Sequence, residues 1–447
     1  MDTPICDFVR RYARQNCLRL HMPGHKGTAY LGVEHLDITE IDGADSLYEA
    51  VGIIRQSEQN AGALFGGETF YSCEGSSLCI RAMLHLCVLY ARQQGRPLLV
   101  MAGRNAHKTF LSAAALLDLE VEWLYSDDAS SYLSCPITAR EVERALETAQ
   151  TLPVAVYLTS PDYLGNMVDL KAIGEVCHRY GVLLVVDNAH GAYLRFLPES
   201  RHPLDLGADL CCGSAHKTLP VLTGGAYLHI APCAPPLFRE QARTALALFG
   251  STSPSYLILQ SLDGANAYLS GDYRQKLAEF VARIEELRIK LTAHGYTLRG
   301  DEPLKLTICA KAYGYTGQSL GRLLQERGIV CEFADSDFLV LMLTPDIGEG
   351  GLHRLELALL DIPAGVPMGE MPPVLHRPQR VMAIRQAVFS PKETIPAEES
   401  LGRVLAAATV SCPPAVPVVV CGERIDREAL DCFRYYGIGR CVVVKEG

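Results

Sequence analysis

The sequence predicts an α/β fold in which helices cover both faces of a mostly parallel sheet. Between about residues 60 and 230, short apolar runs of strand length alternate with segments of helical periodicity. Runs that are apolar on both faces are typical of parallel strands buried by helices on both sides. They lie at residues 96–103, 121–126, 153–161, 181–190, 208–218 and 224–230. Because ligands of such sheets bind at the carboxyl ends of strands, we expect a site there.

Helical patterns fill the intervals between these runs. Residues 76–93 (SSLCIRAMLHLCVLYARQ) repeat apolar positions at helical spacing, and residues 170–181 (LKAIGEVCHRYG) do the same and end on a glycine. Glycine often ends helices because it adopts the left-handed conformation without strain. Two polar clusters, DNAH at 187–190 and SAHK at 214–217, directly follow apolar runs. They therefore fall where the site is expected.

A second region opens with a helical pattern at residues 275–295. Its apolar positions keep helical spacing up to a closing glycine, and they are Leu277, Phe280, Ile284, Leu287 and Leu291. Two apolar runs, 304–310 and 338–345, flank another helical pattern at 319–334. This alternation indicates a second domain of the α+β class.

Proline marks a boundary after that region, in the segment 361–380 (DIPAGVPMGEMPPVLHRPQR). The tail beyond it carries a helix candidate at 381–389, the run CPPAVPVVVCGERI at 412–425 and a strand candidate at 441–445. We therefore expect four parts. They are an N-terminal arm with a loop at the site (1–50), a large domain that carries the site (51–270), a small α+β domain (271–365) and a C-terminal domain (366–447).

Composition narrows the class of protein. The 447 residues are 49% hydrophobic and 21% charged, which is typical of a globular chain, and the net charge of -10 disfavours nucleic acid or anionic membrane as a partner. The apolar runs are shorter than the ~20 residues of a membrane span, and the N-terminus lacks a secretory pattern. The 16 cysteines are scattered without a C-x-x-C pair, which favours free thiols over disulfides or a metal site. We expect a cytoplasmic enzyme that acts on a small molecule and binds no metal.

Three groups point to one cofactor. Lys217 lies in the largely small and apolar stretch GSAHKTLPVLTGGA, and Asp187 ends an apolar run thirty residues earlier, so both are expected at neighbouring strand ends. Burying either charge alone is costly. The Gly-Ser-Ser turn at 75–77 begins a helix and favours a phosphate. A reactive lysine, an acid for a pyridinium nitrogen and a phosphate cup are what pyridoxal phosphate (PLP) requires.

Each group has an ordinary structural alternative. The Gly-Ser-Ser turn could simply cap its helix, because serine is a preferred capping residue. Asp187 could cap a turn or form a structural ion pair. Lys217 could lie at the surface with only its aliphatic stem covered. Their order and spacing together favour the cofactor.

Seven segments make this chain similar to a known family. They are LHMPGHKG (20–27), DITEIDGADSLYEAVGII (37–54), AGRNAHKT (102–109), VYLTSPDYLGNMVDL (156–170), VVDNAHGAYLRF (185–196), GSAHKTLPVLTGGAYLHI (213–230) and STSPSYLILQSLDGANAYL (251–269). The chain resembles the ornithine/lysine/arginine decarboxylase family, whose members have fold type I among PLP-dependent enzymes. The tail from residue 381 resembles the small C-terminal domain of that family.

The resemblance implies roles for matching residues. Lys217 would bind PLP as the internal aldimine, and Asp187 would keep the pyridine nitrogen protonated. His107 would stack on one face of the ring, with Ala189 against the other. The positions that would hold the phosphate or lie beside the cofactor are Gly75, Ser76, Ser77, His190, Ser214 and His216. His190 and His216 could instead bond backbone carbonyls. The resemblance also implies a homodimer or a dimer of dimers with shared sites, in which Ser253 would reach the phosphate of the partner subunit.

Several positions depart from the pattern of the family. Glu74 precedes Gly75 where asparagine is frequent, Asn188 follows Asp187, and Gly224-Gly225 replaces a more polar pair. The chain also lacks the N-terminal wing domain of the long family members, which favours a simple dimer or a dimer of dimers over a large ring. These differences leave the identity of the substrate open.

The resemblance implies α-decarboxylation of a basic amino acid: arginine, lysine or ornithine. The cationic side chain of such a substrate would need carboxylates, and the candidates are Asp42, Asp45 and Glu74. One alternative is an aminotransferase or a carbon-sulfur lyase on the same fold, with Arg322 or Arg354 clamping the substrate carboxylate. A further alternative is a non-catalytic protein that retains the fold, which the intact set of Lys217, Asp187 and His107 disfavours.

Overall fold

The computed structural model describes residues 1–127, 131–373, 377–407 and 416–446, so residues 412–415 of the predicted run 412–425 lie outside the described residues. The chain forms two compact units, and each is discontinuous in sequence. Unit 1 combines Met1–Gly95 with Leu183–Ala278, and unit 2 combines Arg96–Val182 with Glu279–Gly447. The chain therefore passes between the units three times. The four-part division inferred from sequence stays a prediction.

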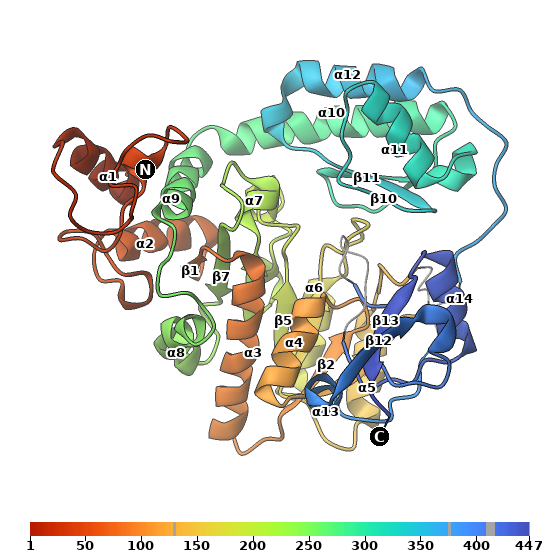
Figure 1. The fold of residues 1–447 in the computed structure, drawn as a ribbon. Coiled ribbons are helices and arrows are strands. Elements are labelled where there is room, and N and C mark those ends of the chain that lie inside the picture. The colour runs from red at the N-terminus through yellow and green to blue at the C-terminus, as the bar shows by residue number, and fades with distance from the viewer. Residues whose placement is uncertain (128–130, 374–376, 408–415, 447) are drawn as a thin grey trace. The chain divides into compact units, whose positions relative to one another are not determined.

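A mostly parallel sheet of seven strands in the order β1-β7-β6-β5-β4-β2-β3 confirms the predicted fold class (Figure 1). Parallel pairing joins β5 to β6, and β2 to both β3 and β4. β7 pairs antiparallel with both of its neighbours, β1 and β6. The strands are β1 Glu68–Ser72, β2 Leu99–Gly103, β3 Glu120–Leu124, β4 Ala155–Thr159, β5 Leu183–Asp187, β6 Leu210–Gly213 and β7 Ala226–Ile230.

In unit 1, the long helix α3 packs against β6, β7 and α8, and its inward side chains are apolar. The N-terminal helix α1 packs on α2 and α9. The α-helices are α1 Pro4–Arg14, α2 Ile53–Phe65, α3 Gly75–Gln93, α7 Ala215–Thr218, α8 Pro236–Ala247 and α9 Tyr256–Ser270; α10 Tyr273–Ala293 begins in this unit. The 3-10 helices are η1 Glu34–Leu36, η2 Leu47–Glu49, η3 Leu194–Phe196 and η4 Pro203–Leu206.

Unit 2 adds two smaller sheets to its share of the large one. One has the order β10-β11-β9-β8, and the other pairs β12 with β13. The strands are β8 Leu298–Arg299, β9 Lys305–Cys309, β10 Phe333–Ala334, β11 Phe338–Met342, β12 Lys392–Pro396 and β13 Arg440–Val444. The helices are α4 Lys108–Leu117, α5 Ala139–Thr148, α6 Leu170–Arg179, η5 Ala310–Tyr313, α11 Gly317–Glu326, η6 Pro345–Ile347, α12 Gly348–Leu360, α13 Ile384–Phe389, η7 Ala397–Glu399 and α14 Arg427–Tyr435.

A buried ion pair joins the two sequence segments of unit 2. Arg104 directly follows β2 and is 1% exposed, and Glu423 in the C-terminal segment is 2% exposed; Arg104 Nη2 lies 3.1 Å from Glu423 Oε2. The guanidinium also donates to the carbonyls of Pro417 and Val418 at 3.1 and 2.9 Å. Buried charges persist only when they are paired and hydrogen-bonded, so the two segments complete each other.

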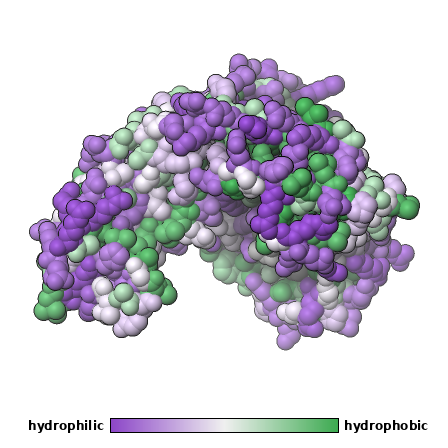
Figure 2. All heavy atoms as spheres, turned by 90° about the horizontal axis from the view of Figure 1, so that it is seen from above, coloured by the Kyte–Doolittle hydropathy of each residue, from purple (hydrophilic) through white to green (hydrophobic). Residues whose placement is uncertain are grey.

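Large apolar side chains are exposed on the N-terminal arm of unit 1. Leu18 is 84% exposed, Leu20 83% and Leu31 87%. On the face drawn in Figure 2, hydrophobic residues lie among hydrophilic ones. No helix within the described ranges is long and apolar enough to cross a membrane.

Candidate cofactor site

Asp187 lies at the carboxyl end of β5 and is 2% exposed. Its Oδ1 accepts a hydrogen bond from the backbone N–H of Ala189 at 3.1 Å and one from Cys212 Sγ at 3.6 Å. Cys212 lies directly opposite Asp187 in the neighbouring strand β6. Burial, together with the nearby Asp187 carboxylate, raises the pKa of the Cys212 thiol well above its ordinary value. The thiol therefore remains protonated and donates to the carboxylate.

Lys217 lies on the short helix α7, which follows β6. Because β5 and β6 are neighbouring parallel strands, the structure places Asp187 and Lys217 at adjacent strand ends, where polar groups of such sheets meet ligands. The turn after β5 brings His190 to Lys217, with Nε2 3.0 Å from Nζ. Lys217 is half-buried and His190 is 6% exposed. An amine, an imidazole and a carboxylate thus converge at this edge of the sheet.

The N-terminal end of α3 supplies donors suited to an anion. Helix α3 starts at Gly75, and the side chain of its N-cap residue, Glu74, makes no hydrogen bond to the N–H groups of the first turn. Ser76 Oγ accepts a hydrogen bond from Ser214 Oγ at 2.9 Å, which links the turn to the start of α7. Backbone N–H groups, hydroxyls and the helix dipole together favour a phosphate dianion.

His216 joins α7 to the glycine pair that follows it. Its Nδ1 donates to the carbonyl of Gly225 at 3.0 Å, so this histidine does bond a backbone carbonyl. Burial lowers the pKa of His216, which keeps the imidazole neutral. The backbone N–H of Gly75 donates to the carbonyl of Gly224 at 2.7 Å. The two glycines therefore fix the start of α3 and α7 to each other.

Ser251, in the loop at 250–255, connects Glu74 to Ser253 by hydrogen bonds. Glu74 Oε1 accepts a hydrogen bond from the backbone N–H of Ser251 at 2.6 Å, and Ser251 Oγ accepts one from the N–H of Ser253 at 3.2 Å. Both Glu74 and Ser253 are exposed. The carboxylate that departs from the family pattern thus holds this loop beside the start of α3.

His107 belongs to unit 2, where it is the N-cap residue of α4. Its Nδ1 accepts a hydrogen bond from the backbone N–H of Thr109 at 3.2 Å and lies 2.9 Å from Thr109 Oγ1. An accepting Nδ1 leaves the proton of a neutral imidazole on Nε2. This arrangement fixes the ring, and the expected stacking on a cofactor stays a prediction.

Comparison with known sequences decides the family. A family model described as Orn/Lys/Arg decarboxylase, major domain, matches residues 3–308, which is more than half of the chain. The chain belongs to the Orn/Lys/Arg decarboxylase family. The resemblance inferred from the sequence motifs is therefore confirmed.

Relatives of this family member match over nearly its whole length. An uncharacterised Bacillus subtilis protein, YaaO, is 32% identical and the match covers 96% of this chain and 93% of YaaO. An arginine decarboxylase of the same organism is 29% identical, with 96% and 92% covered.

Solved structures share the fold of this family member. The lysine decarboxylase of Francisella novicida has a TM-score of 0.81 at 17% identity, with 98% of this chain and 79% of that chain covered. Lysine decarboxylase A from Pseudomonas aeruginosa has a TM-score of 0.81 at 18% identity, with 99% and 80% covered. These likenesses show the α/β fold of a fold type I domain.

Family membership fixes the class of enzyme. The chain is an amino-acid decarboxylase of the PLP-dependent class. The residues present fit that cofactor: Lys217 offers an amine, Asp187 a buried carboxylate, and the α3 end an uncapped helix N-terminus beside Ser76 and Ser214. The alternatives of an aminotransferase and of a non-catalytic protein are thereby disfavoured. Arg322 and Arg354, the two candidates for a substrate clamp, are exposed on α11 and α12.

The structure gives Asp45 a structural role instead of the expected contact with substrate. Asp45 is buried, and its carboxylate accepts hydrogen bonds from the backbone N–H groups of Val51, Gly52, Ile54 and Arg55 at 3.1, 2.8, 3.1 and 3.4 Å. These groups lie before and within the first turn of α2, which an anion stabilises. Asp42 is exposed. Of the three acidic candidates, Asp45 is the one with both oxygens engaged by backbone N–H groups in the described structure, whereas Glu74 accepts one such bond through Oε1.

Asp45→Asn is expected to lower stability and leave substrate binding unchanged. The amide would turn an NH₂ group toward backbone N–H donors, which costs about 1–3 kcal/mol in the free energy of unfolding. Urea unfolding of the variant measures this change. Asp42→Asn is the matched control, because an exposed neighbour should change stability by less than about 0.5 kcal/mol. A raised KM with unchanged stability would restore the role in substrate binding.

Gly224→Ala is expected to disturb the start of α3. Gly224 has φ +102°, and an added Cβ would lie 2.7 Å from the carbonyl oxygen of Cys73, immediately before the Glu74-Gly75 turn. Relieving that clash must move backbone, so we expect PLP affinity to fall at least about tenfold, equivalent to ~1.4 kcal/mol. Fluorescence titration with PLP measures this. Gly264→Ala on α9 is the control, because nothing lies within 4 Å of its added Cβ.

One feature of the site was missed by reasoning from sequence, the thiol of Cys212 that donates to Asp187. The sequence did offer a signal for this contact, because the run ADLCCGSAHKT places Cys212 in the strand that leads to Lys217. A bond from His216 to a backbone carbonyl was an open alternative, and the structure identifies the acceptor as Gly225.

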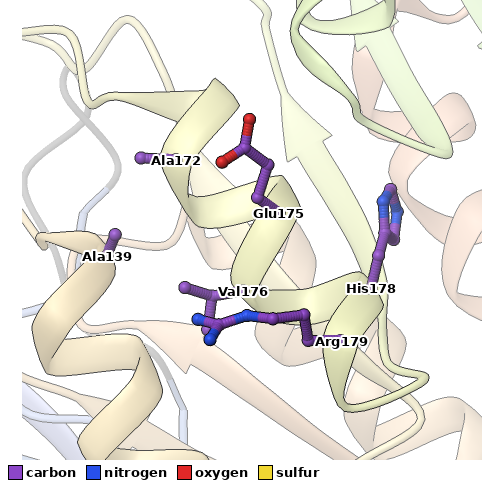
Figure 3. A pocket seen from close by; sticks show the side chains of 6 residues that line it. All are labelled: Ala139, Ala172, Glu175, Val176, His178 and Arg179. Carbon is purple, nitrogen blue, oxygen red and sulfur yellow. The ribbon is translucent and has the colours of Figure 1, made fainter.

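A separate pocket of about 740 Å³ lies at α5 and α6 in unit 2 (Figure 3). Its lining residues are Ala139, Ala172, Glu175, Val176, His178 and Arg179. None of them was predicted to bind the cofactor or the substrate. The candidate site in unit 1 is therefore defined by its side chains and not by this pocket.

Proposed function

We propose that the chain removes the α-carboxylate of a basic amino acid as carbon dioxide and releases the corresponding amine. The observation that carries this proposal is the pairing of Lys217 with the Asp187 turn at neighbouring strand ends in a member of this family. Arginine is the first substrate to test, with lysine and ornithine beside it. The arginine decarboxylases of Bacillus subtilis and Halalkalibacterium halodurans are both 29% identical to the chain, whereas the constitutive lysine decarboxylase of Escherichia coli is 21% identical.

Residues of the matching motifs would hold PLP in this proposal. Lys217 would bind it covalently and Asp187 would face its ring nitrogen. The phosphate would rest on the start of α3. The other residues proposed to contact the cofactor are Gly75, Ser76, Ser77, His107, Ala189, His190, Ser214 and His216, with Ser253 reaching from a partner subunit. When bound, PLP supplies an electron sink for the pair released with carbon dioxide.

Each protein group then has a defined task. Asp187, as a buried carboxylate, would keep a proton on the ring nitrogen, because an opposite charge nearby favours the protonated form. Lys217 would hold the cofactor through its amine and would supply a proton to the α-carbon of the substrate. Burial around Asp187 and His190 excludes water, which strengthens these electrostatic interactions.

In this proposal, carboxylates bind the cationic end of the substrate side chain. Asp42 and Glu74 remain the candidates in this chain, because both are exposed and Asp45 is engaged by backbone N–H groups. Glu74 lies beside the start of α3 and already accepts one hydrogen bond from Ser251, which leaves its second oxygen as the proposed partner for the substrate.

The proposal includes a cytoplasmic homodimer or dimer of dimers. The described cysteines are free, which suits a reducing compartment. Apolar side chains exposed on the N-terminal arm, such as Leu20 and Leu31, are the kind of surface that a second copy covers. Sedimentation of the active protein tests this assembly, and an active monomer would contradict it.

The decisive experiment measures carbon dioxide, amine and keto acid from arginine, lysine and ornithine with purified, PLP-supplemented protein. The proposal expects carbon dioxide and amine in equal amounts from at least one of the three. Keto acid without carbon dioxide would favour the aminotransferase alternative. No product from any of them would overturn the proposed substrate class.

A further inference from the structure

His190 contacts the nitrogen on which the chemistry of Lys217 depends. Its Nε2 lies 3.0 Å from Lys217 Nζ, which is hydrogen-bond distance. The imidazole is 6% exposed, so water reaches it poorly. The contact therefore joins a half-buried amine to a nearly buried base.

The turn after β5 holds the His190 backbone in place. The backbone N–H of Asn188 donates to the carbonyl of Cys212 at 3.0 Å, and the N–H of Gly191 donates to the carbonyl of Asn188 at 2.9 Å. Asn188 Nδ2 also donates to the Gly191 carbonyl at 3.1 Å. One hydrogen bond thus anchors the turn to β6, the strand that leads to Lys217, and two more close the turn on itself. These bonds hold the backbone from which the His190 side chain reaches Lys217.

An amine must lose a proton before it can attack a carbonyl. Lysine side chains are ammonium ions at neutral pH, with no lone pair on nitrogen. A neutral imidazole offers one lone pair, and at 3.0 Å its Nε2 is aligned to accept a proton from Nζ. A glutamine at the same place could accept the hydrogen bond but could not take the proton.

We propose that His190 is the proton acceptor for Lys217, a role that rests on the proposed function of Lys217. The N–H bond of the Lys217 ammonium breaks, its electron pair stays on Nζ, and the proton forms a bond to His190 Nε2. The imidazolium then returns the proton when the amine is next protonated, or loses it to solvent. Asn188, which departs from the family pattern, is a positioning residue through its bonds within the turn.

The test measures the nucleophilicity of Lys217 without any cofactor. The full-length, PLP-free chain is treated with an acetylating reagent at pH 7, and the rate at Lys217 is followed by peptide mass spectrometry. The variants are His190→Gln, which keeps a hydrogen-bond acceptor, and His190→Ala, to which free imidazole is added. Exposed Lys276 and Lys171 in the same samples are the internal references.

We expect acetylation of Lys217 to slow at least about tenfold in His190→Gln, since proton transfer by a positioned base contributes typically 10²- to 10⁴-fold. Imidazole should restore the rate in His190→Ala, and the reference lysines should react equally in all samples. Equal acetylation of Lys217 in the wild type and His190→Gln would overturn the proposal. A slow rate that imidazole does not restore would also overturn it, by indicating a packing role. Because no PLP is present, failure of the proposed function would appear separately, as absence of cofactor uptake.

Discussion

Lys217→Ala should abolish covalent attachment of the cofactor and lower the rate of decarboxylation at least about 10³-fold. The amine would be lost both as the group that binds PLP and as the group that returns a proton to the substrate, and proton transfer alone contributes 10²- to 10⁴-fold. Borohydride reduction followed by mass spectrometry should find PLP on Lys217 in the wild type and not in the variant. Stopped assays of carbon dioxide release give the rate.

Lys171→Ala is the control for this experiment. Lys171 is an exposed lysine on α6, so its loss should change neither measurement. Reduction that attaches PLP to another lysine of the wild-type chain, with Lys217 unmodified, would contradict the assignment.

Asp187→Asn should leave the chain folded and lower its activity by roughly 10- to 1,000-fold. An opposite charge nearby raises the pKa of a cationic nitrogen by about 1–3 units, so a neutral amide lowers the protonated fraction of the ring nitrogen by that factor. The asparagine oxygen can still accept the hydrogen bond from Ala189 that Asp187 accepts now. The absorbance spectrum of the PLP-loaded variant reports the change at the ring, and kcat reports its effect on turnover.

Asp209→Asn is matched to this variant by burial and by position. Asp209 is 6% exposed and lies just before β6, at the opposite end of the strands, where its Oδ2 accepts the N–H of Leu184 at 2.8 Å. Its replacement should lower stability without changing the spectrum. If both variants altered the spectrum equally, general loosening of the sheet would explain the result better than contact with the cofactor.

Most strands of the large sheet were predictable because burial on both faces leaves a continuous apolar run. β4 and β5, for example, fall inside the runs at 153–161 and 181–190. β1 (ETFYS) was missed, because five residues of mixed polarity give a weak signal. The antiparallel direction of β7 was not predictable either, since its apolar run is the same for both directions.

The candidate site was predictable where an isolated charge interrupts an apolar run. That is the case for Asp187 and Lys217, because such charges need partners whatever the details of the fold. The hydrogen bonds of Asp45 could not be predicted from the sequence. Its partners are backbone N–H groups up to ten residues away, and every residue type except proline carries such a group. The contact of His190 with Lys217 depends on the path of a turn, which the pattern of residues does not encode.

The ion pair of Arg104 and Glu423 has a consequence for the order in which the chain folds on the ribosome. The two residues are 319 positions apart, and both are buried in the finished unit 2. At about 5–20 residues per second, translation leaves the guanidinium without its carboxylate for tens of seconds. The segment Arg96–Val182 therefore emerges early, but Arg104 cannot pair with Glu423 until synthesis is nearly complete. Unit 1, in contrast, has all of its residues once Ala278 is made. In nascent chains stalled after about residue 310, unit 1 should thus be folded. The segment Arg96–Val182 should still be unfolded and accessible to chaperones and proteases.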